Sequence, residues 1–364
     1  MFCIIIIQLI EIVFAIFISF FWSSYRIKTE RNCFHTSLNS SLSEVLFFFK
    51  NGMLSGVIIS ILFSILNFLF PNVFILSYQL IFFLELFSII GLLFSFLEYN
   101  LNLIVLISTI FTLMYQKKIP FLHNSIVYIF LILSLISLVS VILIYILPTS
   151  SYYPKIKYLK RRFVGIYQLK QFYLIPLLVY VPMNNSNKFI IHNNAIFILP
   201  LILGFSQSIK KQFPQKNKRR IIISQLFLFI IYSFSILFII KNANIFLLLI
   251  INTILTLIVQ IILKYLDKKG KFCFTKVNNG IRVLYVIPNT PADKMGLQVG
   301  DVIVKCNSIY IHNENEFYYA LQKSPTFCHL KVLDPFNEYR ILESAIYNDS
   351  PYEIGVITFK KVTI

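Results

Sequence analysis

Apolar residues gather in long blocks over most of the chain, with short polar segments between them. Most blocks approach the roughly twenty residues that a helix needs to cross about 30 Å of hydrocarbon. We therefore predict about seven spans within residues 1–265, which would form a multipass α-helical membrane domain. The predicted spans are residues 4–22, 53–70, 73–96, 101–116, 124–147, 221–240 and 245–263.

Residues 171–206 are apolar but do not fit the pattern of two ordinary helices. Pro176, Pro182 and Pro200 interrupt two stretches that are each too short to span, and asparagines separate the stretches. Because both flanks are basic, the segment is expected to begin and end on one face of the membrane. A Pro-rich re-entrant or interfacial hairpin fits this pattern. It could serve as a structural plug or line a binding cavity.

From residue 280 the pattern changes to the short alternation of a folded domain outside the membrane. Apolar side chains recur at every second position over residues 281–287, as on one face of a β-strand. A second apolar strand is predicted over residues 302–304, after the turn that Gly300 and Asp301 favour.

Between these strands the sequence carries the signals of a short helix. Thr290 suits the N-cap, Pro291 the first helical position, and Asp293 the third, where a carboxylate meets free backbone N–H groups. Gly296 can supply the left-handed residue that ends the helix, and Leu297 then returns to the core.

Together, residues 280–307 resemble the core of a bacterial PDZ domain, which reads roughly V-x-P-x-S/T-P-A-x-x-x-G-L-x-x-G-D-x-I. The resemblance implies a small α+β PDZ domain over residues 280–364, joined to the membrane domain by a basic juxtamembrane linker over residues 266–279. A PDZ domain binds an extended peptide as an added strand, between a sheet edge and a helix. Protein or peptide partners are therefore expected.

The resemblance also implies which residues form the peptide groove. The groove helix would be residues 313–323, with Phe317 and Leu321 facing the groove. Residues 352–359 look like the carboxylate-binding loop and its strand, because a glycine there lets the backbone turn N–H groups toward a ligand. The loop and strand residues expected to bind peptide are Ile354, Gly355, Val356 and Ile357.

In the ordinary PDZ order this loop precedes the first strand, yet residues 270–279 do not have its hydrophobic-Gly-hydrophobic pattern. We therefore predict a permuted order, in which the C-terminal strand completes the groove. The alternative is that residues 352–359 form only an edge strand.

Composition and charge agree with a membrane protein. Hydrophobic residues make up 57% of the chain and charged residues 13%, which is far below the charge of a soluble protein. The net charge of +18 lies mostly in short loops beside the predicted spans, so nucleic-acid binding is not expected. The positive-inside rule then places these loops and the PDZ domain in the cytoplasm, where the basic residues can also contact anionic membrane lipids.

The whole layout resembles that of the MinJ-like division-site topology proteins of bacteria. The shared features are several spans, the Pro-punctuated segment, a helical hairpin and a terminal PDZ domain with a hydrophobic-Gly-hydrophobic loop. The resemblance implies a multipass scaffold of the cell membrane, enriched at septum or poles, that binds division-site proteins. A homo-oligomer is compatible with such a scaffold.

Two other functions stay open at this point. A PDZ domain can serve a regulatory subunit of a membrane protease or secretion system. A transporter with a sensor domain is the other alternative, since Glu85 lies in the middle of a predicted span and a buried carboxylate there is costly. No charged partner lies three or four residues from Glu85, so a helix-packing role is the simpler interpretation.

Motifs of known chemistry are absent from the sequence. It contains no H-E-x-x-H zinc motif, no G-x-S-x-G nucleophile motif and no phosphate-binding P-loop. The five cysteines are scattered without a C-x-x-C pair, so neither a zinc site nor a disulfide framework is indicated. We therefore expect a protein that is not an enzyme and has no metal or cofactor.

Overall fold

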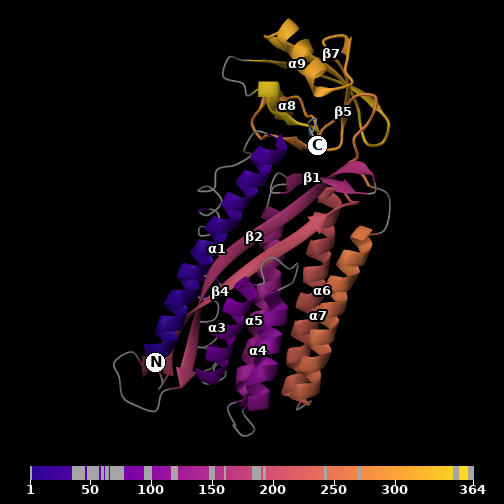
Figure 1. The fold of residues 1–364 in the computed structure, drawn as a ribbon. Coiled ribbons are helices and arrows are strands. Elements are labelled where there is room, and N and C mark those ends of the chain that lie inside the picture. Colours follow the sequence, from indigo (N-terminus) through magenta and orange to yellow (C-terminus); the bar gives the residue numbers. More distant parts are fainter. Residues whose placement is uncertain are drawn as a thin grey trace.

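A computed structural model gives the fold of the chain (Figure 1). It describes residues 2–34, 46, 57–58, 61, 65, 78–93, 101–115, 122–146, 152–159, 161–182, 190–191, 194–241, 244–268, 272–346 and 352–359. Six long helices stand side by side, a long β-ribbon runs along them, and the PDZ domain lies at one end (Figure 1). The N-terminus lies at the opposite end of the helices from the PDZ domain.

The long helices form where the hydrophobic blocks predicted them. They are α1 (Phe2–Phe34), α3 (Tyr78–Leu93), α4 (Leu101–Tyr115), α5 (Leu122–Ile146), α6 (Pro214–Ile240) and α7 (Ile245–Lys268). Within the described residues, three helices are long and apolar enough to cross a membrane, namely Ile126–Ile146, Pro214–Ile240 and Ile245–Lys268. The predicted span over 53–70 lies almost entirely outside the described residues.

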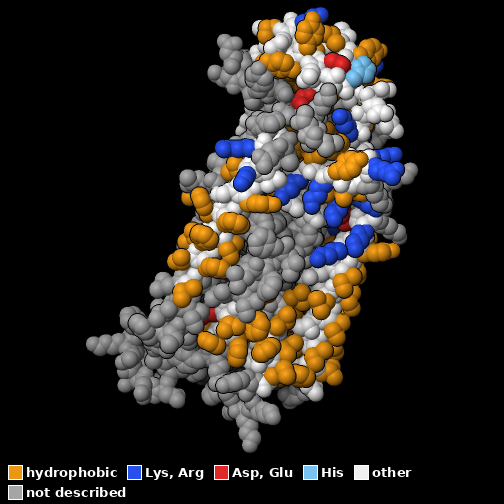
Figure 2. Space-filling view, in the orientation of Figure 1, with side chains coloured by type: hydrophobic (Ala, Val, Ile, Leu, Met, Phe, Trp, Pro, Cys, Tyr) orange, Lys and Arg blue, Asp and Glu red, His pale blue; other side chains and the backbone are white. Residues whose placement is uncertain are grey.

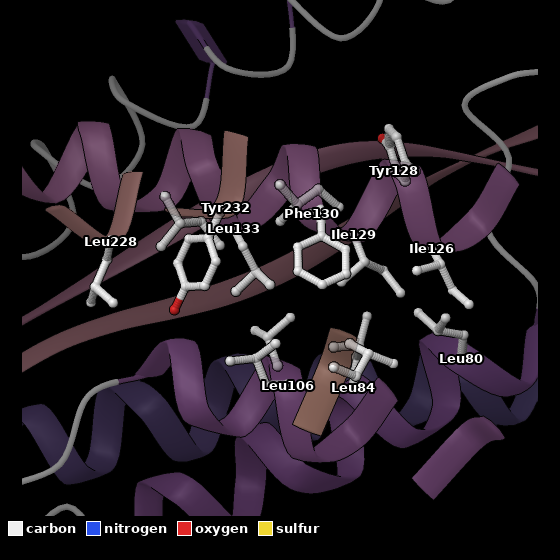
Figure 3. Packing of buried hydrophobic residues seen from close by; sticks show 14 of the residues in the cluster. Leu80, Leu84, Leu106, Ile126, Tyr128, Ile129, Phe130, Leu133, Leu228 and Tyr232 are labelled. Carbon is white, nitrogen blue, oxygen red and sulfur yellow. The ribbon is translucent and has the colours of Figure 1, made fainter. Parts of the chain in front are cut away.

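Large apolar side chains from α3, α4, α5, α6 and α7 fill the core of the bundle, and Figure 3 shows part of this cluster. Leu84 of α3 and Leu106 of α4 lie opposite Phe130 and Leu133 of α5, and Tyr232 of α6 lies beside Leu133. Glu85, the mid-span carboxylate, is also buried, at 1% exposure. Its burial on α3 agrees with a position between helices.

The β-ribbon is a sheet that the hydrophobic pattern did not predict. Strands β1 (Tyr153–Leu159), β2 (Arg162–Pro182), β3 (Ile190–Ile191) and β4 (Asn194–Ile209) pair antiparallel in the order β1-β2-β4-β3. The segment over 171–206 thus folds back on itself as a hairpin of strands, which begins and ends at the same side. Its richness in β-branched and aromatic residues favours strands, and its prolines exclude regular helices.

The PDZ domain consists of short strands and two helices. Its main sheet has the order β10-β9-β7-β5, with β8 paired to β7, and a second sheet pairs β11 with β6. The elements are β5 (Ile281–Arg282), β6 (Tyr285–Val286), α8 (Pro291–Lys294), β7 (Val302–Cys306), β8 (Ile309–Tyr310), α9 (Glu314–Lys323), β9 (Phe327–Leu333), β10 (Tyr339–Ala345), the 3₁₀ turn η2 (Tyr352–Gly355) and β11 (Val356–Ile357).

On the face shown in Figure 2, basic side chains gather in a band near the junction between the helices and the PDZ domain. We call this band the basic collar. It is separated from the far end of the helices by a belt of exposed apolar side chains (Figure 2). Its described members are Lys28, Arg31, Lys155, Lys157, Arg161, Arg162, Lys210, Lys211, Lys216, Lys218, Arg219, Arg220, Lys264 and Lys268.

Candidate functional site

The PDZ motif folds largely as its residues predict. Gly296 and Gly300 both have positive φ angles, +81° and +103°, so glycine is the residue that these turns require. Thr290 is the N-cap of α8 by position, but its hydroxyl donates to the Ile287 carbonyl at 2.6 Å instead of accepting from the helix. The Asp293 carboxylate accepts the Asn289 N–H at 2.9 Å and so stabilises the start of α8.

Asp301 does more than form the predicted turn. Its side chain is fully buried, where one carboxylate oxygen accepts the Gln298 N–H and both lie 2.8 Å from the Arg340 guanidinium. Burial raises the pKa of Asp301, and the bonds to Gln298 and Arg340 partly oppose that rise. The turn is thereby fixed to β10 by an ion pair between the buried carboxylate and the partly exposed Arg340, which the sequence motif alone did not reveal.

The predicted groove helix begins with a variant of the capping box, in which Glu316 bonds the residue before the N-cap Asn313. The Asn313 side chain accepts the Glu316 N–H at 2.9 Å, and the Glu316 carboxylate accepts the His312 N–H at 2.8 Å. The hydrogen bond from the His312 N–H is the main reason that the pKa of Glu316 is lowered. These bonds fix the first turn of α9 beside the end of β11.

Strand β11 is paired on one side only. The Ile287 N–H donates to Gly355 O at 2.9 Å and the Leu284 N–H donates to Ile357 O at 2.7 Å, so these two carbonyls face β6. Because backbone groups alternate along a strand, the N–H and C=O of Val356 point to the opposite side. Within the described residues, no other strand pairs with that side of β11.

The structure brings together most of the predicted groove residues. Ile354 and Val356 share one buried cluster with Phe317 and Leu321 of α9. Gly355 has a φ angle of +89° and Ile354 one of +52°, so the loop does use two left-handed residues in succession.

Ile357 lies on the other face of β11, in a different cluster with Leu284 and Tyr285. The two-residue period of a strand explains the separation from Val356. The same period places Thr358 on the groove side, where its hydroxyl donates to the Glu314 carboxylate of α9 at 3.2 Å. Sequence reasoning missed Thr358, although the alternation from Val356 could have identified it.

The predicted groove residues of the strand and the helix are packed against one another and almost fully buried. Ile354, Val356 and Phe317 are each at most 2% exposed, and Leu321 is 8% exposed. Beyond Thr358 a cavity of about 170 Å³ opens, between the start of α9 and the segment that enters the PDZ domain. Lys276, Gly280, Asn313, Glu314 and Phe359 are among its lining residues. The cavity therefore continues the line of β11 away from Gly355.

Comparison with known proteins shows what this chain is similar to. The sequence model of the PDZ domain family matches residues 282–333. The chain is 24% identical over 377 residues to the cell division topological determinant MinJ of Bacillus subtilis, which covers 95% of this chain and 91% of that protein. The chain resembles MinJ over nearly its whole length and carries a PDZ domain. This similarity extends across the helical part as well as the C-terminal domain.

Two Lacticaseibacillus proteins show a higher identity over a shorter stretch. A "probable cell division topological determinant MinJ" of Lacticaseibacillus paracasei and one of Lacticaseibacillus casei are each 40% identical over 89 residues. Each match covers 24% of this chain and 24% of the relative's own length. The MinJ-like resemblance inferred from layout and PDZ motif is thus confirmed.

Proposed function

We propose that this MinJ-like protein is a membrane-anchored scaffold whose PDZ domain binds partner peptides and takes part in division-site placement. The support for a division role is the similarity to MinJ proteins over nearly the whole chain. The support for an adaptor is the PDZ domain with one side of β11 unpaired. The partners are proteins of the division site, and the groove residues are those predicted from the sequence together with Thr358.

The observation that carries the peptide site is the position of β11 between β6 and α9. A peptide added to the free side would bond the backbone groups of Val356 and would lie against α9, which is the usual geometry of strand addition. Because Val356 and Phe317 are almost fully buried, α9 has to move away from β11 when the peptide enters. The cavity beside Phe359 then receives residues upstream of the peptide's end.

The basic collar supports a second part of the proposal, which is contact with anionic lipids. The collar lies beside the apolar belt of the helices (Figure 2), at the depth where lipid headgroups meet a spanning helix. Each basic residue near an anionic surface contributes about 1 kcal/mol. The collar and the PDZ domain then both lie on the cytoplasmic side of a multipass protein.

The experiment compares the cellular position of three full-length fluorescent fusions, namely the wild type, Gly355→Asp and Gly296→Asp. A side chain at Gly355 would collide with Thr290 and would place charge in the carboxylate loop. Gly296 also has positive φ but has open space around it, so Gly296→Asp is matched in charge and backbone strain. Truncation is a poorer test, because the segment after Lys271 packs against the ribbon.

Wild type and Gly296→Asp are expected to gather at septa or poles, and Gly355→Asp is expected to spread evenly over the membrane. Hydrogen exchange in β7 and β9 establishes whether the PDZ core of Gly355→Asp remains folded. A wild-type fusion spread evenly over the membrane would contradict the division-site role. Unchanged enrichment and partner capture by Gly355→Asp would contradict the groove.

A further inference from the structure

Tyr167 of β2 lies at the centre of the junction between the ribbon and the PDZ domain. Its side chain is 1% exposed, and its ring meets the Phe274 ring edge-on at a centroid distance of 4.7 Å. Its hydroxyl donates to the Leu284 carbonyl, 2.5 Å away, in the strand region that enters the PDZ domain. Burial raises the pKa of Tyr167 well above its ordinary value, so the hydroxyl stays a proton donor at neutral pH.

Leu284 connects this hydroxyl to the candidate peptide strand. Its carbonyl accepts from Tyr167, while its N–H donates to Ile357 O of β11 at 2.7 Å. The side chains of Ile357 and Phe359 also pack in the cluster that contains Tyr167 and Phe274. One face of β11 thus belongs to the groove, and the other face rests on the ribbon.

The segment predicted as a linker strengthens this contact. Residues 274–276 lie against β2 in a short antiparallel bridge, where the Gly165 N–H donates to Phe274 O at 2.8 Å and the Lys276 N–H donates to Phe163 O at 3.3 Å. A Cβ atom at Gly165 would lie 2.9 Å from Leu284 Cδ2, so glycine lets the ribbon approach this closely. The PDZ domain is therefore seated on the ribbon by backbone bonds as well as by side chains.

We propose that Tyr167 is a positioning residue for the peptide site, through which the ribbon of the membrane part holds β11 in the register that accepts a peptide. This inference rests on the proposed peptide-binding function and adds that binding depends on residues outside the PDZ domain. A strand that is already held in place loses less conformational freedom when a peptide binds. By linkage, peptide binding then stabilises the contact between β2 and the PDZ domain.

The test uses the full chain in lipid nanodiscs, with Tyr167→Phe compared with the wild type. Phenylalanine keeps the ring contact with Phe274 and removes only the donated hydrogen bond. The matched control is Tyr158→Phe on β1 of the same ribbon, where the side chain is 61% exposed. The probe is a peptide selected on the wild-type protein from a library of random C-terminal sequences.

Tyr167→Phe is expected to weaken peptide affinity by about threefold to tenfold, as for the loss of one buried hydrogen bond, and Tyr158→Phe to leave it unchanged. Amide exchange over residues 352–359 is expected to accelerate in Tyr167→Phe alone. In the wild type, saturating peptide is expected to slow amide exchange over residues 163–167, and Tyr167→Phe is expected to lose this protection. A merely structural tyrosine would lower thermal stability without removing the response of β2 to peptide.

Equal affinity and equal exchange in Tyr167→Phe and the wild type would overturn the positioning role while leaving the groove intact. A wild-type protein that selects no peptide would instead count against the proposed function. In that case the comparison of amide exchange over residues 352–359 between Tyr167→Phe and the wild type decides whether Tyr167 positions β11. Faster exchange in Tyr167→Phe supports that role, and equal exchange overturns it. Gly165→Val is a second variant, which displaces Leu284 sterically and is expected to shift affinity in the same direction.

Discussion

The helical part and the PDZ domain both bury apolar side chains, but they expose opposite kinds. Between α6 and α7, polar contacts are buried together with apolar ones, with Asn252 donating to the Ser235 hydroxyl at 3.0 Å and Tyr232 bonded to Thr256 at 3.1 Å, while the outward faces of both helices are apolar. In the PDZ domain Phe317 and its apolar neighbours are buried, and charged residues of α9 lie outside.

This difference in the exposed side chains indicates that the helices are surrounded by lipid and the PDZ domain by water. Apolar side chains gain nothing from leaving a lipid environment, so helices within it associate through close packing and polar contacts. In water the burial of apolar surface drives folding. The apolar outer surface of the helices gives way to a polar outer surface at the basic collar (Figure 2). The change from lipid to water therefore lies between the helices and the PDZ domain.

The largest expected effect comes from a matched pair of phenylalanines. Phe317→Ala empties a site that is 1% exposed and is expected to destabilise the PDZ domain by about 3–5 kcal/mol. Phe234→Ala on α6, where the side chain is 57% exposed, is expected to change stability by less than about 0.5 kcal/mol. Denaturation of each variant in detergent micelles, followed by exchange in β9 and α6, measures both. Similar losses would contradict this difference in the exposed side chains.

Removal of Arg340 tests its ion pair with the buried Asp301 carboxylate. Arg340→Ala leaves the Asp301 carboxylate buried without its cation and is expected to cost about 3 kcal/mol near pH 7. Because burial raises the pKa of Asp301, the folded state holds the carboxyl proton more tightly than the unfolded state does. The stability of the fold therefore falls as the pH rises from the unfolded pKa of Asp301 to its higher folded pKa. Without Arg340 the folded pKa rises further.

The loss in Arg340→Ala is therefore expected to be smaller at about pH 4 than at about pH 7. Chemical denaturation at both pH values gives the comparison. Asp301→Asn combined with Arg340→Ala is the control, since the double variant carries no buried charge and should show little pH dependence. A loss that is equal at both pH values would contradict the role of the carboxylate.

The smallest expected effect concerns the polar contact inside the bundle. Asn252→Ala removes the bond to Ser235 and is expected to destabilise the pairing of α6 and α7 by about 0.6–1 kcal/mol, the range of single hydrogen bonds between membrane helices. Thr253→Ala is a matched control, because Thr253 bonds only its own helix at Ile250 O. Unfolding measured by steric trapping in bicelles has the resolution for this difference.

Local chemistry made much of the PDZ domain predictable. Gly296 and Gly300 mark turns that need positive φ, and Asn313 with Glu316 marks the start of α9, because these effects depend on neighbours in sequence. Asp301 with Arg340 could not be predicted, since the pair joins residues that only the fold brings together. The family resemblance places Ile357 in the groove with its neighbours, although strand alternation turns it toward the ribbon.

In the membrane part, the hydrophobic blocks predicted helices well but did not predict the ribbon. A block length of about twenty residues indicates a spanning helix because each helix satisfies its own backbone bonds. The strands β2 and β4 satisfy theirs through residues far along the chain, and no short-range pattern specifies that pairing. The prolines excluded helices over 171–206, but they did not identify the partner of each stretch.

Those prolines also affect whether the ribbons of neighbouring copies of the protein can pair edge to edge in the membrane. Pro176 lies opposite Pro200 in the ladder, and a paired proline fits only where its nitrogen points away from the partner strand. Pro182 lies an even number of residues after Pro176 on the same strand, so its nitrogen also points away from β4. The outer edges of the ribbon therefore have no N–H donor at Pro176, Pro182 and Pro200. Exposed strand edges recruit further strands, and proline blocks that recruitment. The ribbon therefore resists fusing with its neighbours into a growing sheet, even where many copies accumulate.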